Sequence, residues 1–221
     1  MEPTIKILIY IHAFFGGVGL LSGIGSISVK KGSELHKKMG RIFTYSMLTS
    51  SSIALVISQM PNHKNQFLLL IGLFTTYLVL AGNRALTFNS RYKTKATLLD
   101  KSISGLMLAA SIIMISIGAQ GFFKELPNAI LYAFFGGFGL FLTLGDFKTF
   151  KTFSQNKNAW LTSHLGRMVG ALIASVTAFL VTAINIGSVV VWIAPTLLGT
   201  LYITYWNVKL RPKTNKKKAP K

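Results

Sequence analysis

The side chains best suited to chemistry in this 221-residue chain are its four histidines, His12, His36, His63 and His164. A neutral imidazole binds metals and haem iron, and a b-type haem held by two histidines needs both at one depth on facing helices. His36 and His164 each stand shortly before a Gly-Arg pair, whereas His12 and His63 lie near the other ends of apolar segments. The sequence therefore allows haem b or another metal on either side of a helical bundle. The same histidines also suit polar positions in helix packing.

A second group of side chains is basic. Lys37, Lys38 and Arg41 follow one apolar segment, and Arg167 occupies the corresponding place much later in the chain. Arginine and helix N-termini both favour phosphate oxygens, so this group predicts a site for an anion or a lipid headgroup. Basic residues beside apolar segments also orient membrane proteins. A role in orientation and general headgroup contact is the open alternative.

The residue types that are absent exclude several kinds of catalysis. The chain has no cysteine, which removes disulfides, thiolate metal sites and cysteine nucleophiles. No acidic residue lies in the middle of an apolar segment, so neither paired catalytic carboxylates nor a buried acid for proton pumping is expected. The glycine motifs that bind dinucleotides or phosphate are absent, as is the His-Glu-x-x-His zinc motif. The sequence favours binding over catalysis.

Long apolar segments must position these side chains. Hydrophobic residues make up 51% of the chain and charged residues only 13%, whereas soluble domains carry about 25% charged residues. Segments of about 20 apolar residues are long enough to cross a bilayer as helices. We predict an all-α, polytopic integral membrane protein. Its seven transmembrane helices are expected at about 5–29, 40–60, 67–86, 101–123, 128–147, 163–186 and 189–208.

The net charge of +19 is concentrated in short loops between these helices and in residues 209–221, which predict a basic, disordered tail. This distribution is typical of a membrane protein and not of one that binds nucleic acid. The loops after the first, third and fifth helices and the tail are basic, and the other loops are nearly neutral. The positive-inside rule then predicts an N-terminus outside the cell (inner) membrane and a cytoplasmic C-terminus. The tail could also contact anionic lipid.

The chain contains an internal repeat, because residues 13–20 (AFFGGVGL) return as residues 133–140 (AFFGGFGL). The repeat predicts two parallel three-helix units, at about 5–88 and 128–208, joined by a linking helix at about 101–123. Small residues mark close helix contacts in bilayers, and they predict that the first helix packs against the fifth and the second against the sixth. These residues are Gly16, Gly17, Gly19, Gly23, Gly136, Gly137, Gly166, Gly170 and Ala174.

His12 is the one histidine expected well inside the membrane, about 10 Å below the outer surface at 1.5 Å per residue. An ionisable side chain at such depth marks a functional site by default. Its counterpart in the second repeat is Tyr132, so a site built on His12 would be asymmetric.

Two motifs carry a family resemblance. They are Lys-Gly-x-x-x-His-Lys-x-x-Gly-Arg at 31–41 and His-x-Gly-Arg-Met-x-Gly-Ala at 164–171. Around them, over 12–47 and 160–181, the chain resembles an uncharacterised family of bacterial multi-span membrane proteins, defined as a domain of unknown function. His164, Gly166, Arg167 and Met168 are its most specific positions. The resemblance implies an integral inner-membrane protein and brings no activity.

The sequence thus predicts a non-enzymatic membrane protein that binds lipid, an anion, a partner subunit or a second copy of itself. The alternative is a b-type haem-binding redox protein that uses the four histidines.

Overall fold

The computed structural model describes residues 2–88, 93, 95–126, 128–152, 158–184 and 189–211. The predicted tail beyond residue 211 lies outside these residues. Within them the chain is all-α, as predicted, and contains no strand. The helices are α1 (Glu2–Ser28), α2 (Glu34–Ile57), α3 (Gln66–Ala85), α4 (Leu98–Phe123), α5 (Ala129–Thr152), α6 (Ala159–Ala178) and α7 (Val189–Lys209). A short 3-10 helix, η1 (Leu86–Phe88), follows α3, and a π-helix, η2 (Phe179–Ala183), continues α6.

The helices begin and end near the predicted positions, with two differences that affect the interior. α2 begins earlier, at Glu34, because the Ser33 side chain caps it by accepting a hydrogen bond from the His36 backbone N–H at 3.2 Å. α5 continues to Thr152, beyond its predicted end near residue 147. Asp146 is therefore inside the helix and not at its terminus.

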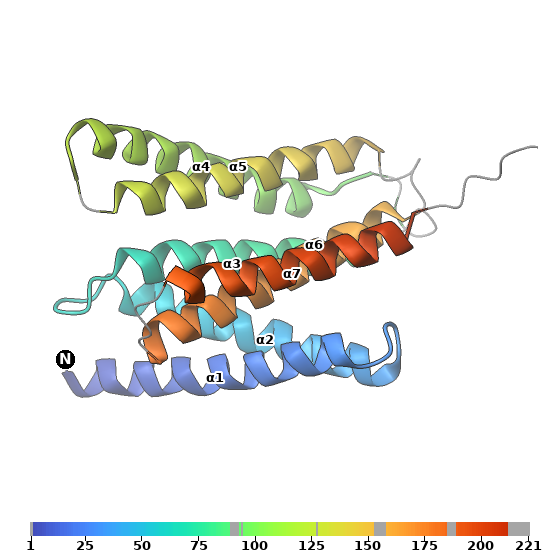
Figure 1. Ribbon diagram of the computed structural model, residues 1–221, viewed down its shortest axis with the longest axis horizontal. Helices are drawn as coiled ribbons and strands as arrows, with labels where there is room; N and C mark the ends of the chain where they lie inside the picture. The colour runs from blue at the N-terminus through green and yellow to red at the C-terminus, as the bar shows by residue number, and fades with distance from the viewer. Residues whose placement is uncertain are drawn as a thin grey trace, which may run out of the picture.

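Successive helices run back and forth, so the connections alternate between the two ends of the bundle (Figure 1). The hairpin of α4 and α5 lies on one side, the hairpin of α1 and α2 lies on the other, and α3, α6 and α7 lie between them. The central contact is α3 against α6. The prediction that α1 packs against α5 is wrong, since the two are on opposite sides of the bundle. α2 meets α6 through longer side chains, such as Met47 against Ser175.

The repeated glycines mark close helix contacts, but with different partners in the two halves. A Cβ on Gly19 of α1 would lie 2.5 Å from the Met47 sulfur of α2. A Cβ on Gly136 of α5 would lie 2.9 Å from the Ser111 carbonyl oxygen of α4. A Cβ on Gly23 or Gly139 would be as crowded as one on Gly19 or Gly136. Gly16 and Gly170 face single side chains, and Ala174 is buried. A Cβ on Gly17, Gly137 or Gly166 would meet nothing within 4 Å, so these three do not mark contacts.

Among the described residues, five helical segments are long and apolar enough to cross a membrane: α1, α3 with η1, α4, α5, and α6 with η2. α2 is less apolar, because its first two turns are basic and its middle is rich in serine and threonine. Many large apolar side chains point outward, among them Leu21, Leu106 and Phe141. These features are consistent with a membrane protein.

Candidate functional site

A cavity of about 590 Å³ lies between α1, α2, α3 and the end of α6 with η2, and we call it the His12 cavity. Its walls are mainly apolar, and its rim is the exposed turn 62–65 between α2 and α3. Along α1 it extends from Ile9 to Leu20, which is about 16 Å at 1.5 Å per residue and about half of a 30 Å hydrocarbon core. None of its lining residues carries a carboxylate, and its ionisable side chains are His12, His63 and Lys64.

A group of polar side chains crosses the middle of this cavity at one level. The His12 Nδ1–H donates to the Ser50 carbonyl oxygen at 2.9 Å, and the Ser50 hydroxyl donates to the His12 carbonyl oxygen at 3.0 Å. The next residue, Ser51, is hydrogen-bonded to Thr76 of α3, with 2.8 Å between the hydroxyl oxygens. Consecutive serines of α2 therefore tie α1 and α3 together at the same depth.

Two atoms at this level have unused hydrogen-bonding capacity. A carbonyl oxygen only accepts, so His12 carries its proton on Nδ1 and keeps Nε2 as an acceptor. Thr75 lines the cavity and is only 4% exposed. Its hydroxyl has no hydrogen-bond partner among the described residues. Buried polar groups are nearly always hydrogen-bonded, so an unpartnered hydroxyl facing a cavity indicates a place for a polar ligand group.

The other predicted histidines divide between the two ends of the bundle. His63 lies in the exposed rim of the His12 cavity. His36 and His164 lie at the opposite end, where the Nδ1 atoms donate to the carbonyl oxygens of Ser26 at 3.0 Å and of Gly82 at 2.9 Å. Among the described residues, no group of three or more histidine and acidic side chains could hold a metal ion.

At the end with the basic loops, the structure contains a buried charged group that the sequence did not predict. One Asp146 oxygen accepts hydrogen bonds from the Tyr77 hydroxyl at 2.6 Å and the Ser104 hydroxyl at 2.9 Å. The other oxygen accepts from Arg167 Nη2 at 2.6 Å. We call these four residues the Asp146 cluster. It joins α3, α4, α5 and α6, and Arg167 adds a bond to the Leu142 carbonyl oxygen at 2.7 Å.

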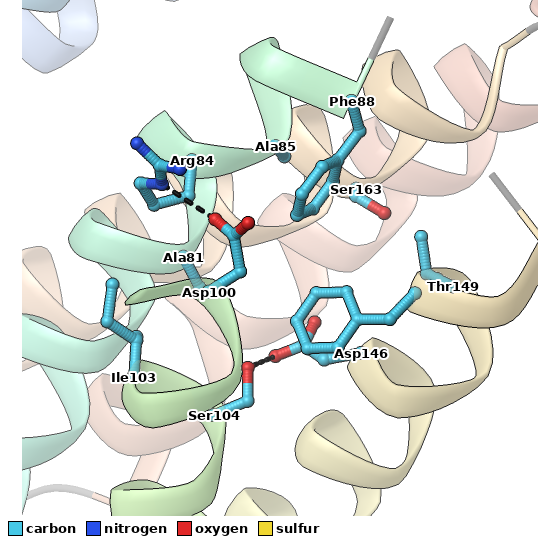
Figure 2. A pocket seen from close by; sticks show the side chains of 11 residues that line it. Ala81, Arg84, Ala85, Phe88, Asp100, Ile103, Ser104, Asp146, Thr149 and Ser163 are labelled. Atoms are coloured by element: carbon cyan, nitrogen blue, oxygen red, sulfur yellow. Dashed lines mark hydrogen bonds and ion pairs between the residues drawn. The ribbon is translucent and has the colours of Figure 1, made fainter. Parts of the chain in front are cut away.

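A second buried carboxylate lies beside the Asp146 cluster. Asp100 accepts hydrogen bonds from Arg84 Nε at 2.7 Å and from the Thr97 backbone N–H at 2.7 Å, and it also pairs with Lys93. A space of about 10 Å³ separates the two acids, and both line it (Figure 2). That is about the room that one water molecule needs.

These contacts overturn the prediction that no acidic side chain lies in the interior. The interior does contain acidic side chains, because α5 continues past Asp146 and because Asp100 completes the first turn of α4. Arg167 is paired with Asp146, and its place in an anion site stays a prediction. Lys37, Lys38 and Arg41 are exposed on the first two turns of α2, so for them the anion site stays a prediction.

A sequence signal for the buried acid exists in α5. Gly136, Gly139, Thr143 and Asp146 follow one another at spacings of three and four, so they lie on one helix face. Because the glycines of that face contact α4, the acid that continues the face must also point inward.

Comparisons with known proteins found no matching family model, no matching curated protein and no matching solved structure. The family resemblance therefore stays a prediction, and any function must be argued from the geometry.

Proposed function

We propose that this chain is an integral inner-membrane protein of a bacterium that binds a lipid-like molecule in the His12 cavity. The observation that carries the proposal is the cavity itself. Its volume of about 590 Å³ falls within the range of about 300–1,000 Å³ that is usual for ligand sites. Its walls are apolar, its polar groups are few and grouped at one level, and its depth matches one leaflet.

We further propose that all seven helices cross the membrane in a 3+1+3 arrangement, with the N-terminus outside. The alternation of the connections between the two ends supports α2 and α7 as spans in addition to the five most apolar segments. The basic loops then share the cytoplasmic end with the Asp146 cluster, and the His12 cavity opens toward the outer leaflet.

A fusion experiment tests this orientation. We expect green fluorescent protein joined after residue 211 to fluoresce and alkaline phosphatase joined there to be inactive, because the first folds in the cytoplasm and the second outside. Phosphatase inserted between Asn62 and His63 should be active. Active phosphatase after residue 211 would contradict the orientation and would move the cavity to the cytoplasmic leaflet.

Filling the cavity tests the binding function. Gly17 lines the cavity, and a Cβ there meets nothing within 4 Å, so Gly17→Leu should place its side chain in the ligand's space without disturbing the helices. Losing the burial of about two methylene groups corresponds to about a tenfold loss of occupancy. Native mass spectrometry of protein released from membranes would measure the bound lipid-like species.

The matched control is Gly137→Leu, at the same position of the second repeat. Gly137 is equally unobstructed, but it is exposed and lines neither described cavity. The fraction of the Gly137→Leu variant that carries the bound lipid-like species should equal that of the wild type. Equal ligand signals from the Gly17 and Gly137 variants would count against the His12 cavity as the site.

A b-type haem protein is the second candidate. The Nδ1 atoms of His12, His36 and His164 each donate to a backbone carbonyl oxygen, and metal-bound imidazoles are commonly oriented in this way. His12 and His63 also line one cavity. Visible spectra of protein purified from haem-replete cells, before and after dithionite, test this candidate. A Soret band with sharp reduced α and β bands would support haem, and a featureless spectrum would remove it.

A further inference from the structure

The His12 cavity also carries information about the ligand's head group. We propose that the ligand is an uncharged single-chain amphiphile whose head carries a hydroxyl group, bound with the head at the level of His12 and Thr75. This inference rests on the proposed function, because it requires that the cavity bind a ligand.

The free polar groups of the cavity lie at one level. His12 is bonded to Ser50, and Thr75 stands next to Thr76, which is bonded to Ser51. Since Ser50 and Ser51 are neighbours in α2, the free His12 Nε2 and the free Thr75 hydroxyl belong to one level of the cavity. Both lie well below the rim, where the walls are otherwise mainly apolar.

The hydrogen-bonding capacity of these two groups suits a hydroxyl partner. Nε2 of this histidine accepts a hydrogen bond, and the threonine hydroxyl can both donate and accept. A hydroxyl group suits both positions chemically, since it can donate to an imidazole and accept from a threonine hydroxyl. An ether or a ketone could accept from Thr75 but would leave Nε2 without a donor.

The charge that the ligand's head can carry is limited by the cavity. Burying a charged head in an apolar cavity is costly unless an opposite charge lies beside it. The lining residues at the level of His12 include no lysine, arginine or acid, and Lys64 is in the exposed turn at the rim. An uncharged head therefore fits the interior. An anionic head would have to stay at the rim, beside Lys64 and His63.

The cavity also has room for a chain. Gly17 lies beyond His12 along α1, on the side away from the rim, where it faces open space and the cavity continues to Leu20 between mainly apolar side chains. A single alkyl or isoprenoid chain can therefore extend from the head past Gly17, further into the membrane.

Three probes with one chain and different heads test the inference. They are hexadecan-1-ol, hexadecyl phosphate and hexadecane, each measured for equilibrium binding to the full-length protein in phosphatidylcholine nanodiscs against empty nanodiscs. We expect the alcohol to bind about tenfold more tightly than the alkane, the effect of one or two net hydrogen bonds. We also expect it to bind more tightly than the phosphate.

Substitution of the free hydroxyl completes the test. Thr75→Val keeps the shape and removes the hydroxyl, so the preference for alcohol over alkane should fall to about threefold or less, the share of one hydrogen bond. Thr75→Ser should retain the preference. The control is Thr182→Val, because Thr182 also lines the cavity but donates its hydroxyl to the Ala178 carbonyl oxygen at 2.6 Å. That variant should keep the wild-type preference.

The outcomes separate the two levels of inference. If no probe binds the wild type above empty nanodiscs, the proposed function fails. If the alkane binds as well as the alcohol, or if the phosphate binds most tightly, the cavity binds lipid but the head-group assignment is overturned. Tightest binding of the phosphate would point to an anionic lipid held at Lys64. These wild-type comparisons decide the matter even if Thr75→Val fails to fold.

Discussion

Replacing Asp146 with asparagine is expected to destabilise the protein strongly, because it leaves a buried positive charge unpaired. The side chains of Asp146 and Arg167 are only 9% and 11% exposed, so the substitution leaves a buried guanidinium without its counter-ion. It also weakens two hydrogen bonds, from Tyr77 and Ser104. Removing one partner of a buried ion pair typically costs about 3–5 kcal/mol. Unfolding of the purified protein by heat or by SDS titration would measure the loss.

Glu125→Gln is the matched control, since it removes one negative charge from an exposed turn. Its stability should differ from that of the wild type by less than about 0.5 kcal/mol. The double variant Asp146→Leu with Arg167→Met should recover much of the loss, because replacing both partners with apolar side chains avoids an unpaired buried charge. If Asp146→Asn unfolded like Glu125→Gln, the Asp146 cluster would not contribute to stability.

Gly136→Val should cause the second large loss, by separating α4 from α5. A Cβ at this position would lie 2.9 Å from the Ile115 backbone nitrogen and 2.9 Å from the Ser111 carbonyl oxygen. Backbone atoms of a helix cannot rotate away as a side chain can, so the helices must move apart. Overpacking typically costs 1–3 kcal/mol, and we expect about 3 kcal/mol here, measured in the same unfolding assay.

Gly137→Val controls for the change in helix propensity from glycine to valine, because a Cβ on Gly137 meets nothing within 4 Å. Valine is the better helix former of the two, so the Gly137 variant should lose no stability. Equal losses at the two positions would mean that the close contact between α4 and α5 is unimportant for stability.

Both effects concern features that the sequence revealed only in part. The apolar segments predicted all seven α-helices of the described residues, because a continuous run of about 20 apolar residues has few other stable conformations in a bilayer. The repeat also contains glycines that pack closely, namely Gly19 in the first half and Gly136 and Gly139 in the second, although Gly17 and Gly137 do not. It could not identify their partners, because the same AFFGG sequence packs against α2 in the first half and against α4 in the second. The residues on a helix face determine how closely another helix can approach. Which helix packs there depends on the rest of the bundle.

The residues of the candidate site were also predicted only in part. His12 stood out because an ionisable residue within an apolar segment is rare, and it does line the cavity. Thr75 and the Ser50–Ser51 pair could not be assigned to a binding site from the sequence, because hydroxyl side chains in membrane helices more often form hydrogen bonds between helices. Asp146 was missed because an acid near the end of an apolar segment resembles an interfacial residue. Only the spacing from Gly136 and Gly139 indicates that it points inward.

The π-helix η2 bears on how this protein can change over evolutionary time. A π-helical turn holds more residues than the α-helical turn it replaces, so the residues beyond it are rotated relative to an uninterrupted helix. In this chain the rotation falls at the wall of the His12 cavity, where Phe179 and Thr182 are among the lining residues. The shape of the cavity therefore depends on the number of residues in α6 as well as on their identity. Insertion or deletion of one residue in η2 would give this wall new side chains and leave the contact between α6 and α3 before Ala178 in register.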